Sequence, residues 1–171
     1  YGRGAYYWAL VMTCMTLYWT YCVLVAAFGF FWFDFQVHDA TAFFTWMGIL
    51  MLMGLAGTAF GIVGGVLIND DMTAIQVMSA LLIFLNFGAG FMANTGDGAN
   101  WLVLFLSYIS PYFYTCELLM TLVLDGVHFT GPIFEFYGYT RGNSVCVASL
   151  FAWSGILFVV GWIGIYVRNR T

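Results

Sequence analysis

The sequence contains no lysine, and only 7% of its 171 residues are charged. Soluble domains carry about 25% charged residues, because they must present a wetted surface. A chain that is 63% hydrophobic and 21% aromatic cannot cover itself with polar groups. The composition therefore excludes a soluble globular protein and predicts an integral membrane protein that crosses the bilayer several times.

Several kinds of chemistry are also missing from the sequence. No basic cluster indicates a nucleic-acid surface, and no Cys or His spacing indicates a metal site. The motifs GxxxxGK[ST], GxSxG and HExxH are absent. We therefore expect no catalytic residue, no metal and no cofactor in this chain. The sequence begins at Tyr1 without a methionine, so we expect a processed protein or an excerpt of a longer one.

Apolar residues gather in five stretches. These are residues 5–33, 40–68, 72–93, 101–124 and 144–167. About 20 helical residues cross the hydrocarbon core of a bilayer, and backbone groups in lipid must be bonded internally. Each stretch that spans the membrane should therefore be a helix. The short polar turn at 69–71 predicts that the second and third stretches form an antiparallel pair.

The fourth stretch is poorly suited to crossing. Pro111 lacks a backbone donor, and Glu117 at mid-depth would cost at least ~2.5–3.5 kcal/mol. Arg3 precedes the first stretch, and Arg168 and Arg170 follow the last. Because arginine favours cytoplasmic flanks, both ends should lie on one side, which requires an even number of crossings.

The sequence therefore predicts an all-α polytopic membrane fold with a re-entrant extracellular helical hairpin before the last helix. Four transmembrane helices are expected at about 5–33, 40–68, 72–93 and 144–167, the hairpin at 94–124 and an external loop at 125–143.

Two residue patterns indicate faces that contact protein or solute. Glycines at every fourth position suggest a helix-packing face in the second stretch, with ordinary glycine enrichment as the alternative. They are Gly57, Gly61 and Gly65. In the third stretch a stripe recurs at helical spacing and faces protein or a cavity, because polar groups facing lipid are costly. It comprises Gln76, Ser79, Ile83 and Asn86. Hydrogen bonding between helices and a solute pathway both explain this stripe.

Two cysteines flank the predicted external loop. Cys116 and Cys146 would form a disulfide if the loop faces an oxidising compartment, and two free thiols are the alternative.

The stretch "GAGFMANTGDGANWLVLFLSYISPYFYTCELL", residues 88–119, resembles the re-entrant region of G-type ABC transporters, the White, sterol and multidrug half-transporters. The matching residues are Gly90, Phe91, Met92, Asn94, Trp101, Tyr108, Ser110, Pro111, Tyr112, Tyr114, Glu117 and Leu119. Upstream, "GAYYWAL" and "HDATAFFTWMGIL" resemble the entries to the third and fourth helices of that family. Phe113 stands where the family has an arginine, and Leu10 where it has a lysine.

The resemblance implies helices three to six of a six-helix transmembrane domain. It implies that the helical face with Ser79, Ile83 and Asn86 lines a central cavity, and that Phe91 and Met92 form a plug between two cavities. The re-entrant hairpin would help to roof the outer cavity. Its residues are Trp101, Tyr108, Ser110, Pro111, Tyr114 and Glu117.

We therefore expect the permease portion of a G-type exporter that moves a lipid, sterol or other hydrophobic substrate. ATP and Mg²⁺ would be bound by a nucleotide-binding domain outside this chain, and a second half-transporter would complete a homo- or heterodimer. The plasma membrane is the expected location, with an organellar membrane as the alternative. The alternative function is a non-transporting accessory subunit that retains the fold within a larger membrane complex.

Overall fold

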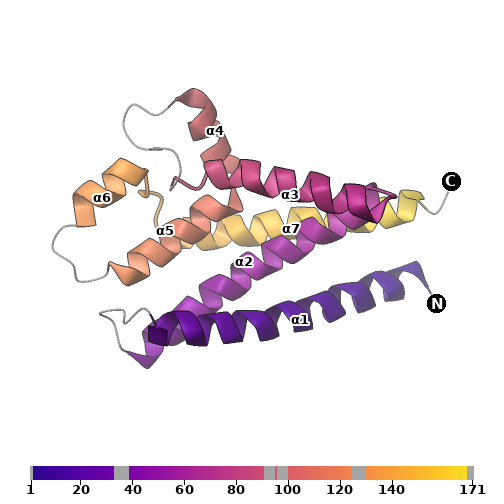
Figure 1. Ribbon diagram of the computed structural model, residues 1–171, viewed down its shortest axis with the longest axis horizontal. Coiled ribbons are helices and arrows are strands. Elements are labelled where there is room, and N and C mark those ends of the chain that lie inside the picture. Colours follow the sequence, from indigo (N-terminus) through magenta and orange to yellow (C-terminus); the bar gives the residue numbers. More distant parts are fainter. Residues whose placement is uncertain (1, 33–38, 91–94, 96–99, 125–129, 169–171) are drawn as a thin grey trace.

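A computed structural model of the chain describes residues 2–32, 39–90, 95, 100–124 and 130–168. Over these residues the regular structure is entirely helical (Figure 1). The helices are α1 (Arg3–Trp32), α2 (Ala40–Leu67), α3 (Asp71–Phe87), α4 (Trp101–Ile109), α5 (Pro111–Val123), α6 (Thr130–Tyr137) and α7 (Asn143–Arg168).

Membrane-spanning capacity is concentrated in three of these helices. Among the described residues, α1, α2 and α7 are long and apolar enough to cross a membrane. The helix α3 is apolar but shorter, with 17 residues, and α4 and α5 form an apolar pair bent by 82°. The all-helical membrane fold with a bent helix pair, predicted from the sequence, is confirmed.

The long helices run roughly side by side (Figure 1). The start of α1, the start of α3 and the end of α7 lie at one end of the molecule, which we call the terminal end. The short helices α4 and α6 lie toward the opposite end, which we call the hairpin end. Because α1, α2, α3 and α7 alternate in direction, the chain returns to the terminal end after α7.

The helix α2 lies at the centre of the packing, with its most extensive contacts to α7 and α1. Close approach depends on two of its glycines. A Cβ added at Gly54 would lie 2.2 Å from the Tyr18 ring, and one at Gly64 would lie 2.4 Å from the Met78 side chain. A larger residue at either position would therefore require the Tyr18 ring or the Met78 side chain to move.

The predicted glycine face lies elsewhere on α2. Among the described residues, a Cβ added at Gly57, Gly61 or Gly65 would meet no heavy atom within 4 Å beyond the local helix backbone. Among the described helices, the close contacts of α2 are therefore at Gly54 and Gly64 instead. The helix-packing role of the Gly57, Gly61 and Gly65 face stays a prediction.

Two clusters of buried side chains form the core. The cluster nearer the terminal end joins α1 to α2 and comprises Tyr7, Val11, Met15 and Ile62. The Tyr7 hydroxyl donates a hydrogen bond of 2.7 Å to the carbonyl of Phe158 in α7. The cluster nearer the hairpin end joins α2, α5, α7 and the segment before α7, and comprises Ile49, Phe113, Tyr114, Leu118, Tyr139, Cys146 and Leu150.

The ends of α3 follow from its flanking residues. Asp70 caps the start, since its side chain accepts the backbone N–H of Thr73 at 2.8 Å. Gly88 caps the other end, and Gly90 has φ +82°, a left-handed conformation that favours glycine. The helix therefore ends at Phe87, six residues earlier than the apolar stretch suggests. The expected external loop also contains a helix, α6.

Candidate functional site: the polar face of α3 and the hairpin elbow

The polar stripe predicted on α3 is exposed throughout. Gln76, Ser79 and Asn86 are exposed, and Ile83 retains 63% of its accessible surface. The side of α3 that packs on the rest of the chain is different and includes the buried residues Ala74 and Leu85. The stripe therefore faces away from the other described helices, and no described element covers it.

The elbow between α4 and α5 is built around Ser110 and Pro111. Ser110 is extended, with ψ 119°, and Pro111 occupies the first turn of α5, where its missing N–H is tolerated. The Ser110 hydroxyl, fully buried, donates a hydrogen bond of 2.8 Å to the carbonyl of Leu85. The elbow is thereby fastened to the last turn of α3.

Glu117, in α5, is buried and retains only 1% of its accessible surface. Its Oε1 accepts the backbone N–H groups of Arg141 and Gly142 at 2.7 and 2.9 Å. The Cys146 thiol lies beside the same carboxyl group. Oε2 has no hydrogen-bond partner among the described residues. Glu117 therefore does not face lipid, because protein surrounds it.

Arg141 belongs to the segment between α6 and α7, and its side chain lies against the elbow. Nη1 donates to the carbonyl of Ser107 at 3.2 Å, and Nη2 donates to the Ser107 hydroxyl at 3.1 Å. The guanidinium carbon is 4.1 Å from the ring centre of Tyr108, 4.3 Å from that of Phe113 and 5.2 Å from that of Tyr114. Cation–π contacts of this kind contribute roughly 0.5–2 kcal/mol each, according to how far they are shielded from water.

The segment before α7 is also tied to the end of α3. The Tyr139 hydroxyl donates to the carbonyl of Ala89 at 2.8 Å, and the Thr95 hydroxyl donates to the carbonyl of Tyr137. Burial, and next the adjoining Cys116 thiol, raise the pKa of Tyr139 well above its ordinary value, so its hydroxyl stays protonated. Gly138 has φ +68°, and a Cβ there would lie 2.6 Å from the Thr95 carbonyl oxygen.

The remaining predicted hairpin residues divide by exposure. Tyr114 is buried and its hydroxyl donates to the carbonyl of Tyr108 at 2.8 Å. Trp101 and Tyr108 are exposed, retaining 74% and 64% of their accessible surface. The predicted plug residues Phe91 and Met92 lie outside the described residues.

Both cysteines of the sequence-allowed disulfide are free thiols in the structure. Each has a different neighbour, since Cys116 lies beside Tyr139 and Cys146 lies beside Glu117. The two thiols are unbridged in the structure, and the disulfide between them stays a prediction. Among the described residues, no group of three His, Cys, Asp or Glu side chains could hold a metal ion.

Arg141 and Ser107 were missed by sequence reasoning. The signal available was the position of Arg141, since the other three arginines lie within four residues of the chain ends. A single interior cation in a chain this apolar needs a partner. Its partner, Ser107, is 34 residues away in the sequence, and no local pattern predicts a contact over that separation.

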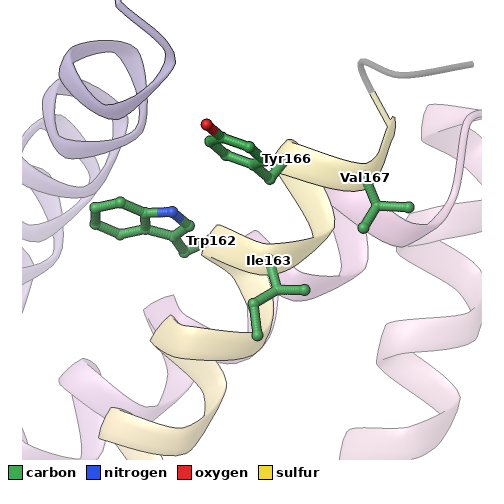
Figure 2. A pocket seen from close by; sticks show the side chains of 4 residues that line it. All are labelled: Trp162, Ile163, Tyr166 and Val167. Atoms are coloured by element: carbon green, nitrogen blue, oxygen red, sulfur yellow. The ribbon is translucent and has the colours of Figure 1, made fainter.

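A hollow of about 360 Å³ lies on α7 near the terminal end and is lined by Trp162, Ile163, Tyr166 and Val167 (Figure 2). In the same view, Trp162 and Tyr166 project on the side of α7 where α1 passes (Figure 2). Trp and Tyr rings favour the boundary between lipid and water. The hollow contains none of the predicted cavity residues, so it is separate from the polar face of α3.

Comparison with protein families matches residues 1–124 to the description ABC-2 type transporter. The matched region runs from the first residue to just past α5, and covers more than half of the chain. The chain belongs to the ABC-2 type transporter family. No curated protein that was compared matches it. Together with the apolar helices, membership in the ABC-2 family makes this an integral membrane protein with the membrane part of a transporter. Partnership with a nucleotide-binding ABC domain follows from the family, whereas α6, Arg141 and α7 lie outside the matched residues.

Proposed function

We propose that this chain is the permease portion of a G-type ABC exporter. In this account α1, α2, α3 and α7 cross the membrane, and the terminal end faces the cytoplasm. The α4–α5 elbow would then lie on the outer side and roof the outer cavity. Membership in the ABC-2 family and the alternating helix directions support this arrangement.

The observation that carries the proposal is the exposed polar stripe on α3. An amide side chain such as Gln76 or Asn86 facing hydrocarbon is costly, so these residues must face water or another protein. In a helix with 100° per residue, Ser79 lies about 200° from Val77, which is exposed on the opposite flank. The polar stripe and the apolar flank therefore face different surroundings.

A second half-transporter facing α3 would enclose the stripe in a cavity between two copies. Phe91 and Met92 would separate this cavity from the outer one. ATP and Mg²⁺ would be bound by the nucleotide-binding domain, because this sequence has no phosphate-binding motif. Hydrolysis there would switch the pair of permeases between inward-open and outward-open states.

The substrate class follows from the character of the predicted cavity. One polar stripe on an otherwise apolar helix suits a molecule with a small polar group and a large apolar body. A lipid, a sterol or another flat hydrophobic compound has this form. We propose the plasma membrane as the location.

The test is transport by the complete protein, assembled with its nucleotide-binding domain in proteoliposomes. Asn86→Leu should lower ATP-dependent movement of a fluorescent lipid or sterol by about tenfold, the effect of losing roughly 1.4 kcal/mol of interaction. The matched control is Val77→Leu on the apolar flank, which should transport normally. Equal transport by the unsubstituted protein and Asn86→Leu would remove the stripe from the substrate pathway.

A second candidate is a non-transporting accessory subunit that retains the ABC-2 fold. It is favoured by the scarcity of basic residues, since the chain has no lysine and has Leu10 and Phe113 where G-type transporters have basic residues. Purification from native membranes discriminates between the two candidates. A stable complex with unrelated membrane subunits and without an ATPase domain would support the accessory role.

A further inference from the structure

The elbow between α4 and α5 leaves a hydrogen bond unmade. In a continuous helix the carbonyl of Ser107 would accept the N–H of residue 111. Residue 111 is proline and has no N–H, so this carbonyl is left without its helical donor. Ser107 retains none of its accessible surface, so water cannot replace the missing donor.

Arg141 supplies the donor that Pro111 lacks. Its guanidinium bonds both to the Ser107 carbonyl, at 3.2 Å, and to the Ser107 hydroxyl, at 3.1 Å. The Tyr108 carbonyl, the next one along, accepts the Tyr114 hydroxyl at 2.8 Å. Two carbonyls at the end of α4 are thus satisfied by side chains from other elements. A cation at this position also complements the negative end of the helix dipole.

Glu117 makes the reverse contact at the start of α7. Its carboxyl group accepts the N–H groups of Arg141 and Gly142, which immediately precede that helix. An acidic group is favourable at the positive end of a helix dipole. Hence α5 holds the start of α7 through Glu117, while the segment before α7 holds the end of α4 through Arg141.

We propose that Arg141 is the positioning residue of the hairpin, and that it makes α4, α5 and the start of α7 move as one body. The planar guanidinium is suited to this role, because it donates to two acceptors and lies against the rings of Tyr108 and Phe113 at the same time. This inference goes beyond the proposed transport function and does not depend on it.

The test is amide hydrogen exchange of the full chain in lipid nanodiscs, without nucleotide or substrate. Arg141→Gln should raise exchange in the last turn of α4 roughly tenfold, because local opening of a helix end follows the free energy that holds it. Exchange in α1, which packs mainly on α2, should stay within about twofold of the unsubstituted protein, since a local opening leaves helices outside it protected. Arg141→Lys should fall between the two, because lysine keeps the charge and loses the two-pronged donor.

Thr140→Ala is the matched control, because Thr140 is the exposed neighbour of Arg141 in the same segment, and it should leave exchange unchanged. If Arg141→Gln does not fold, Ser107→Ala tests the same contact. It removes the hydroxyl that accepts from Nη2 of Arg141 and donates to the Leu104 carbonyl, and should give a smaller rise confined to α4. Unchanged exchange in α4, or an equal rise in α1, α2 and α4, would overturn the proposal. Because no transport is measured, failure here is distinguishable from failure of the exporter function.

Discussion

Replacing Gly88 by alanine should destabilise the protein markedly, although Gly88 adopts an ordinary backbone conformation. Its φ of −76° and ψ of −3° are open to any residue. Space is the constraint, since an added Cβ would lie 2.7 Å from both the carbonyl carbon and the carbonyl oxygen of Leu106. Ordinary contacts of this kind are 3.4–4 Å. Backbone atoms cannot swing aside, so α4 would have to move away from α3.

Two effects determine the magnitude of the Gly88→Ala destabilisation. Overpacking in a filled interior costs about 1–3 kcal/mol. Displacing α4 also weakens the hydrogen bond from Ser110 to Leu85, worth about 0.5–1.5 kcal/mol. A loss of about 3 kcal/mol lowers the melting temperature of a chain of this size by roughly 6–12 °C.

The assay is thermal unfolding in detergent, followed by intrinsic tryptophan fluorescence. The matched control is Gly57→Ala, because a Cβ at Gly57 meets no heavy atom within 4 Å among the described residues. Alanine is the better helix former by ~1 kcal/mol in a helix interior, so this control should melt at the same temperature or higher. If the Gly88→Ala protein has the same melting temperature as the unsubstituted protein, the close contact between Gly88 and α4 does not limit stability.

Three further outcomes are expected. Ser79→Cys should react with a hydrophilic thiol reagent in the membrane-embedded protein and Val77→Cys should not, measured above the labelling of the four native cysteines. Equal labelling would contradict a stripe that lines an aqueous cavity. The hydrogen bonds from the side chain and backbone of Thr73 lower the pKa of Asp70 below its ordinary value of 3.8. This cap therefore stabilises the protein at pH values above 3.8, and the stabilisation is lost as the pH falls from there through the lowered pKa. Unfolding followed between pH 3 and pH 6 should therefore be less pH-dependent in Asp70→Asn, and an unchanged slope would show that the cap contributes nothing. Ser110→Ala should lower stability by about 0.5–1.5 kcal/mol in chemical unfolding, because the buried Leu85 carbonyl loses this donor and keeps the Gly88 N–H.

The sequence was sufficient for the features that depend on local composition. Apolar stretches of the right length predict α1, α2 and α7, since bilayer thickness alone sets their size. Ser110-Pro111 predicts the bend between α4 and α5, because proline removes a donor wherever it occurs in a helix. The spacing along α3 predicts which residues share its polar face.

Features that depend on contacts between distant residues could not be predicted. The end of α3 at Phe87 results from Gly88 and Gly90, which look like further apolar membrane sequence. Only the structure shows α4 packed on Gly88, and Thr95, Tyr137 and Tyr139 packed around Gly90. Likewise, Gly54 and Gly64 are packing positions because Tyr18 of α1 and Met78 of α3 lie against them. The spacing of glycines within α2 does not predict which side chains of other helices will pack against them.

We propose, as the central claim, that the chain crosses the membrane four times, with both ends on one side and the start of α4 on the other. Single cysteines at Gly2, Thr171 and Asn100 test it directly, using a thiol reagent that does not cross membranes on sealed right-side-out vesicles. Asn100→Cys should be labelled at once, whereas Gly2→Cys and Thr171→Cys should be labelled only after the vesicles are made permeable. Labelling of just one of the two end positions before permeabilisation would contradict the account.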